Sequence, residues 1–102
     1  MPYKHRFDPV AADEYENAYN WYYRQNAVAA DRLLLAVEES ISAICADPHR
    51  YRKSHKNLRE LSLKKYPYTL IYHIDEDKQT IVVISLFHHK RNPKKKYTKR
   101  KK

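Results

Sequence analysis

The sequence predicts a single α+β domain: an N-terminal strand, an antiparallel two-helix hairpin, and then a three-stranded antiparallel meander, forming a small sheet covered by the helices. Two observations predict this class. Apolar side chains recur at helical spacing through the first half of the chain, and at a spacing of two through the second half. The length of 102 residues is close to that of an ordinary domain, so we expect one hydrophobic core.

The first half begins with a short strand and a helix. Residues 3–7 are aromatic at both ends and basic between, which is typical of a first strand or an edge strand. Asp8 and Pro9 then form a helix start, because the carboxylate can accept from free backbone N–H groups and proline fits the first helical position. The helical pattern stops near Gln25 and Asn26. One apolar stripe runs along this helix through Ala11, Tyr15, Ala18 and Tyr22.

A second helix follows directly and ends at Asp47-Pro48. Because the connection between the two helices is very short, they are expected to pack antiparallel. The polar and basic segment from His49 to Asn57 is expected to be a loop. The apolar face of the second helix contains Leu34, Val37, Ile41 and Ile44.

The second half predicts three strands, near residues 58–63, 66–75 and 80–87. The last is almost continuously apolar, which is typical of a central strand covered on both faces. The chain contains no glycine, so the turn at residues 75–79 lacks the usual residue for a left-handed conformation. We expect a four- or five-residue loop built on a type I turn, which avoids that conformation.

The positive charge is concentrated at the C-terminus. The formal net charge is +9, yet residues 1–89 hold 12 Lys or Arg and 12 Asp or Glu, whereas residues 90–102 hold nine Lys or Arg and no acid. We therefore divide the chain into a domain over 1–93 and a basic tail over 94–102. The tail is either a solubilising end or a nucleic-acid contact that acts through counterion release. Its candidate nucleic-acid-binding residues are Lys94, Lys95, Lys96, Lys99 and Arg100, with Tyr97 placed to stack on a base.

Several classes of protein are disfavoured. The single cysteine, Cys45, cannot form an internal disulfide, and no apolar run reaches the roughly 18 to 20 residues that span a bilayer. The first ten residues lack the apolar segment of a signal peptide. No ligand spacing such as Cys-x-x-Cys is present. We expect a cytoplasmic protein with no membrane contact, no metal and no cofactor.

Motifs in a fixed order carry a resemblance. Trp21-Tyr22 lies near the end of the first helix, and Arg59 precedes the aromatic-Pro-Tyr strand of residues 66–72. The sequence Phe-His-His-Lys-Arg-Asn-Pro then closes the domain at 87–93. Together these motifs resemble the RelE/ParE toxin superfamily, whose members are also described as plasmid stabilisation proteins. The resemblance covers roughly residues 3–97 and implies the same fold.

The resemblance implies the toxin component of a type II toxin–antitoxin system, which inhibits growth and is neutralised by a cognate antitoxin. ParE-like members poison DNA gyrase, and the overall pattern favours this side. The alternatives are a RelE-like, ribosome-dependent mRNA endoribonuclease and a non-toxic module that binds nucleic acid or a partner. The tyrosines of the first helix are expected to pack in the core, and some could line an apolar groove for the antitoxin. These are Tyr15, Tyr19, Tyr22 and Tyr23.

Whether the chain is an enzyme stays open. RNA cleavage without a metal requires groups that activate the 2′-OH, stabilise the developing charge and protonate the leaving group. Three strand positions that are basic in RelE hold Glu60, Ser62 and Thr69 in this chain. A metal-independent endoribonuclease would therefore need a rearranged site. Its candidate catalytic residues are Arg59, His88, Arg91 and Tyr97; for Arg59 the alternative is a structural ion pair, and for His88 a solvated strand end.

Overall fold

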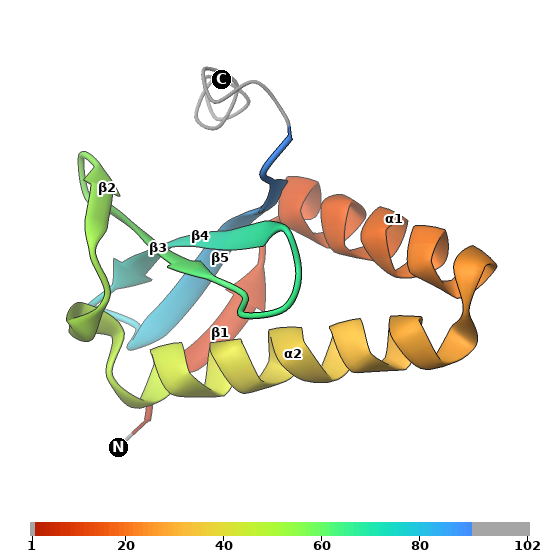
Figure 1. Ribbon diagram of the computed structural model, residues 1–102. Helices are drawn as coiled ribbons and strands as arrows, with labels where there is room; N and C mark the ends of the chain where they lie inside the picture. The colour runs from red at the N-terminus through yellow and green to blue at the C-terminus, as the bar shows by residue number, and fades with distance from the viewer. Residues whose placement is uncertain (1, 91–102) are drawn as a thin grey trace.

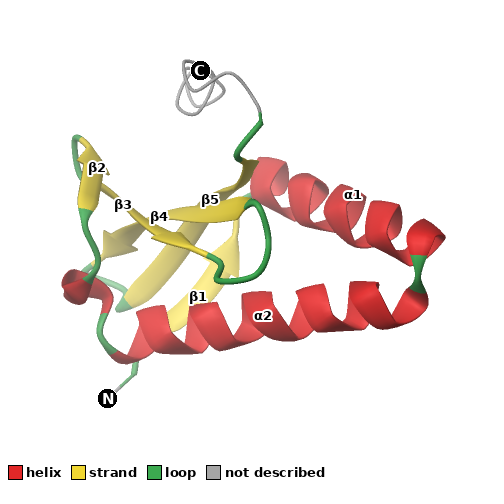
Figure 2. Ribbon diagram, in the orientation of Figure 1, coloured by secondary structure: helices red, strands yellow, loops and turns green. Residues whose placement is uncertain are grey.

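The computed structural model describes residues 2–90, and over this range the chain forms a helical hairpin packed against one mixed sheet (Figure 1). The sheet has the strand order β1-β5-β4-β3-β2, with β1 parallel to β5 and the other neighbours antiparallel. Both helices lie on the same side of the sheet (Figure 2), so the predicted α+β class is confirmed. The elements are β1 (Lys4–Phe7), α1 (Pro9–Gln25), α2 (Ala27–Ala46), the short 3-10 helix η1 (Pro48–Arg50), β2 (Lys53–His55), β3 (Leu58–Ser62), β4 (Tyr68–Asp75) and β5 (Thr80–His88).

The segment from His49 to Asn57 is not a simple loop, and that expectation was wrong. It contains η1 and β2, and β2 adds a fifth strand at the edge of the sheet. The strand has three residues and an irregular register with β3, too short for an alternating pattern to appear in the sequence. In addition, β4 begins at Tyr68 rather than at residue 66, just after Pro67.

The helical hairpin depends on two capping residues. The Oδ1 atom of Asp8 accepts from the backbone N–H of Ala11 at 3.0 Å, as the helix-start pattern predicts. Asn26 acts at two helix ends: its N–H donates to the carbonyl of Tyr22, and its side chain accepts from the N–H of Val28 at 2.8 Å. One residue therefore ends α1 and begins α2, so the second helix turns straight back. In residues 2–90, neither helix combines the length and apolarity that a bilayer crossing requires.

The main core lies between the hairpin and the sheet, and a smaller apolar cluster lies on the other sheet face. A β-bulge places Ile84 as an extra residue of β5, because Ile71 pairs with Ser85 whereas Tyr72 pairs with Val83. The main core then receives Ile81, Val83 and Leu86, together with Leu33, Val37, Ile44, Leu70 and Tyr72. The smaller cluster contains Ile71, Val82, Ile84 and Phe87.

The edge of β5 beyond β1 is capped by a carboxylate. β1 pairs only with residues 80–83 of β5. Further along β5, the Oε1 atom of Glu14 on α1 accepts from the N–H of Leu86 at 3.0 Å and from the hydroxyl of Ser85 at 2.9 Å. A helix side chain thus supplies the acceptor that a neighbouring strand would otherwise supply.

The turn between β4 and β5 contains a residue in the left-handed conformation, so the expectation that this turn would avoid that conformation was wrong. Gln79 has a φ of 50°. This conformation costs a non-glycine residue about 1 to 2 kcal/mol. Local bonds offset the cost, because the Gln79 side-chain amide donates to the carbonyl of Glu76 and the N–H of Lys78 donates to the Asp75 carboxylate. The second left-handed residue is Lys56, at the β2–β3 turn, with a φ of 53°.

Candidate functional site

A chain of polar side chains crosses the sheet face that points away from the helices. The hydroxyl oxygens of Ser62 and Thr69 are 2.9 Å apart, and the Thr69 oxygen is 2.9 Å from Nε2 of His89. Antiparallel pairing places Ser62 opposite Thr69, and a bond from the His89 N–H to the Pro67 carbonyl brings the imidazole beside them. Thr69 is buried, whereas Ser62 and His89 are exposed. The buried Thr69 hydroxyl thus connects two exposed side chains, Ser62 and His89.

The same face carries a buried carboxylate. Glu60 lies two residues before Ser62 on β3, so both side chains lie on the same face of the sheet; Glu60 pairs with Ile71 of β4. The carboxylate is 3.5 Å from Nη2 of Arg52 and the residue is 8% exposed. Glu60, Ser62 and Thr69, the three positions that depart from the RelE pattern, therefore lie side by side. They provide hydroxyls and a negative charge where a phosphate-cleaving site needs positive charge.

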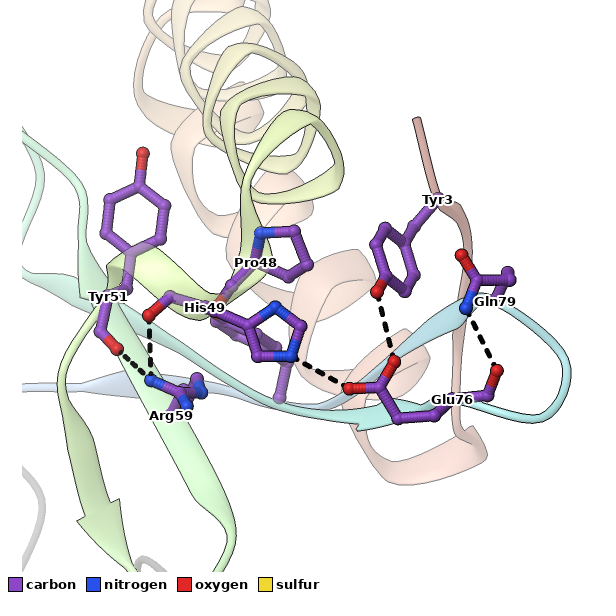
Figure 3. Close-up of polar contacts among 8 residues, drawn as sticks. Tyr3, Pro48, His49, Tyr51, Arg59, Glu76 and Gln79 are labelled. Carbon is purple, nitrogen blue, oxygen red and sulfur yellow. Dashed lines mark hydrogen bonds and ion pairs between the residues drawn. The ribbon is translucent and has the colours of Figure 1, made fainter. Parts of the chain in front are cut away.

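Arg59 lies on the opposite face of β3 and holds the preceding segment in place. Its Nη1 atom donates to the carbonyl of His49 at 3.1 Å and to that of Tyr51 at 2.6 Å (Figure 3). Tyr72, its partner in β4, donates a hydroxyl to the Pro48 carbonyl at 2.7 Å. Burial raises the pKa of Tyr72 to about 12, and the Arg59 charge opposes this shift. Both side chains thus join η1 to the sheet.

His88 and His89 occupy opposite faces at the end of β5. The His88 ring packs edge-on against Tyr68 with ring centres 5.0 Å apart, and its Nδ1 atom accepts from the N–H of Lys90. Along β4, the partners of Arg59 and His88 are four residues apart, about 13 Å at the spacing of a strand. The structure does not bring these two candidates together. The other candidates, Arg91, Tyr97, Lys94, Lys95, Lys96, Lys99 and Arg100, lie outside the described residues.

His89 is the site residue that the sequence did not single out from its neighbour. The useful signal is strand register. Tyr68 pairs with His88, so the next residue, His89, reaches the face that holds Thr69 and Ser62. Two adjacent histidines at a strand end cannot be assigned to faces until the pairing is known.

A second polar cluster ties β1 and η1 to the β4–β5 turn. The Tyr3 hydroxyl donates to Oε1 of Glu76 at 3.0 Å, and Nε2 of His49 is 2.8 Å from Oε2 (Figure 3). The bonds to His49 and then to Tyr3 lower the pKa of Glu76. His49 and Glu76 are about half exposed, so this cluster is a surface clasp rather than an enclosed site.

In the described part of the chain, thiol chemistry would depend on Cys45, and metal binding would depend on His, Cys, Asp and Glu side chains. Cys45 is buried, and burial raises the pKa of its thiol, which disfavours the reactive thiolate. Within residues 2–90, no group of three His, Cys, Asp or Glu side chains is placed to hold a metal ion.

A groove of about 840 Å³ opens between α2 and the segment that leads through η1 and β3. Its lining includes the apolar side chains of Leu35, Ala36, Ala43 and Leu61 and the aromatic rings of Tyr51 and Tyr66. Leu35 is 55% exposed. The α1 tyrosines expected to line such a groove are not among the residues around this one. The charged residues that line it are basic with one exception, Glu39; the basic ones are Arg32, Arg50, Lys64 and Lys65.

Comparison with known proteins identifies the class and then the family. The model of the family described as the ParE toxin of the type II toxin–antitoxin system, parDE, matches residues 6–93. The protein is therefore a toxin of a type II toxin–antitoxin system. It belongs to the ParE toxin family, which confirms the resemblance read from the motifs and its ParE side. Among curated proteins, no sequence matches significantly.

Solved structures support the same fold. The chromosomal ParDE toxin–antitoxin system from P. aeruginosa matches with a TM-score of 0.70 and 14% identity, over 84% of this chain and 95% of that chain. The RelBE2 toxin–antitoxin complex from Mycobacterium tuberculosis matches with a TM-score of 0.61 and 22% identity, over 86% and 92%. The intact E. coli RelBE complex matches with a TM-score of 0.61 and 17% identity, over 87% and 99%.

Proposed function

We propose that this toxin acts in the cytoplasm, poisons DNA gyrase, and is neutralised by a cognate antitoxin. Membership of the ParE family supports the gyrase target. The observation that carries the choice over RNA cleavage is the sheet face with Glu60, Ser62 and Thr69. A scissile phosphate placed there would meet a buried carboxylate that already has a partner in Arg52 at 3.5 Å. None of these three positions supplies a cation to stabilise the developing negative charge of the transition state.

A reaction with purified gyrase tests the proposal. The chain is incubated with supercoiled plasmid, gyrase and ATP, and DNA is then released with detergent and protease. A gyrase poison traps the cleaved intermediate, so linear plasmid accumulates with increasing toxin. Parallel reactions with ribosomes and a defined mRNA provide the comparison. Cleaved mRNA with no linear plasmid would overturn the gyrase assignment.

The groove beside α2 is our proposed docking site for the antitoxin. Its apolar lining residues suit the apolar face of a helix, and its basic lining residues suit acidic residues beside that face. Ala36 and Ala43 have small side chains, which allow close approach of another helix. This proposal concerns an acidic amphipathic helix of the antitoxin.

Filling the groove tests the docking site. Ala36→Arg places a long side chain in the groove, whereas Ala12→Arg makes the same change at an exposed position of α1. On co-expression with the cognate antitoxin, we expect Ala36→Arg to lose co-purification and Ala12→Arg to keep it. Retained co-purification of Ala36→Arg would move the docking site elsewhere.

The alternative is a RelE-like, ribosome-dependent endoribonuclease with a rearranged site. One observation favours it: the Ser62–Thr69–His89 chain, with separations of 2.9 Å, could accept the proton of an attacking 2′-OH at His89. Replacing His89 by Ala would then abolish toxicity in a folded protein. Thr69→Val would weaken it by misplacing the imidazole. Full toxicity in both variants would remove this alternative.

A further inference from the structure

The described part of the chain is close to neutral, but its charge is strongly separated. Residues 48–65 contain seven Lys or Arg and one acid, a formal excess of six positive charges. The rest of the described chain, residues 2–47 and 66–90, contains six Lys or Arg and eleven acids, an excess of five negative charges. We call residues 48–65 the positive end; in the sequence this segment is distinct from the basic tail.

Part of this positive charge lies on a projecting arm. We define the basic arm as residues 52–57, which include β2 and its turn into β3. In Figure 1, β2 and this turn extend from the sheet on the side away from the helical hairpin. Arg52, Lys53 and Lys56 are all exposed. Lys56 has a φ of 53°, so the turn is tight.

The arm has the composition of a phosphate-binding surface. Protein interfaces are depleted in lysine and rely on apolar or aromatic anchors. The arm contains no apolar residue, and the next one, Leu58, packs against the smaller apolar cluster of the sheet. Exposed cations on a two-stranded ribbon suit the phosphates beside a DNA groove.

We propose that the basic arm binds the phosphodiester backbone of duplex DNA. The negative remainder of the domain assists, because it orients the arm toward a polyanion during approach. The binding is independent of base sequence, since phosphate contacts carry no sequence information. The inference is separate from the gyrase proposal, because it is measured with DNA and the chain alone.

Fluorescence anisotropy with a labelled duplex of about 20 base pairs tests the arm over about 50 to 200 mM salt. The arm variant carries Lys53→Gln and Lys56→Asn, and asparagine tolerates the left-handed conformation at the turn. The control variant carries Arg24→Gln and Lys78→Gln, which removes the same charge at exposed positions outside the positive end. Both use the full chain, so the tail is common to all measurements.

We expect the arm variant to bind at least about tenfold more weakly at low salt. Its plot of log affinity against log salt should be shallower by about 1.8, near 0.9 for each lost phosphate contact. The control should stay within about twofold of the parent. Equal losses in both variants would mean that binding follows net charge alone and would overturn the proposal, as would no loss in either.

Two further measurements keep the result unambiguous. A variant with Lys53→Arg and Lys56→Arg preserves the charge, so it should bind like the parent; weak binding by this folded variant would contradict a charge-based contact. Labelled polyglutamate, measured in the same way, tests whether the arm binds acidic protein instead of DNA. If polyglutamate binds as tightly as DNA and shows the same dependence on the arm, the surface recognises acidic protein and the DNA assignment fails.

Discussion

Replacing Arg59 by Met should destabilise the fold rather than remove a catalytic group. Its guanidinium donates to the carbonyls of His49 and Tyr51 at 3.1 and 2.6 Å. A hydrogen bond that involves a charged group contributes about 1.5 to 3 kcal/mol. Arg59 is partly exposed, so water will replace part of these contacts, and we expect a total loss of about 2 kcal/mol. For a domain of this size, that lowers Tm by about 8 to 16 °C.

Urea and thermal unfolding of purified variants measure this loss. Arg59→Lys should lose about half as much, because the lysine ammonium keeps a charged donor but places it on a flexible stem instead of a rigid guanidinium. Arg24→Met removes an exposed arginine at the end of α1 and should change stability by less than about 0.5 kcal/mol. If Arg59→Met keeps the parent Tm but loses toxicity, the structural reasoning is refuted and Arg59 becomes a functional residue.

Three further predictions concern polar groups outside that contact. The hydrogen bonds to His49 and then to Tyr3 lower the pKa of Glu76, so the ionised carboxylate stabilises the fold above pH 4.5, the ordinary pKa of the group, and this stabilisation is lost as the pH falls through the lower pKa of the folded state. Glu76→Gln should therefore lose less Tm than the parent over this acid range. An unchanged dependence of Tm on pH would contradict the assignment. The Tyr15 hydroxyl is buried with no hydrogen-bond partner among the described residues, so Tyr15→Phe should be neutral or stabilise by up to about 1 kcal/mol in urea unfolding, and a large loss would reveal a partner. Glu14→Ala leaves the Leu86 N–H without its carboxylate and should cost about 2 kcal/mol, with faster amide exchange at Leu86; protected exchange would show that the carboxylate is dispensable.

The helical half of the fold was predictable because its signals are local. Asp8 and Pro9 mark the start of α1, and the predicted cap is present at 3.0 Å. The break near Asn26 marks the turn between helices, and that residue caps both of them. Capping depends on residues two to four positions apart, so the sequence alone can reveal it.

The features that escaped prediction depend on pairing between distant segments. β2 is three residues long, and basic side chains hide its strand character. The sheet face on which His89 lies depends on the register between β4 and β5, and this register shifts by one residue at the β-bulge. By contrast, the positive excess of residues 48–65 could have been counted from the sequence, but the neutral total for residues 1–89 concealed it.

The candidate site was only partly predictable for the same reason. Glu60, Ser62 and Thr69 were noticed as departures from a family pattern, and their proximity follows from the pairing of β3 with β4. Arg59 was chosen for its residue type, but its contacts to two backbone carbonyls appear only in three dimensions. A sequence motif identifies which residues matter more readily than it identifies what they touch.

Pulse-labelling of growing bacteria after brief induction of this chain tests the central claim most directly. Incorporation of thymidine and of amino acids is followed side by side from the first minutes. The gyrase account predicts that thymidine incorporation falls first, with induction of a DNA-damage response, while protein synthesis continues. An immediate stop in amino-acid incorporation with continued DNA synthesis would contradict it and place the target at the ribosome.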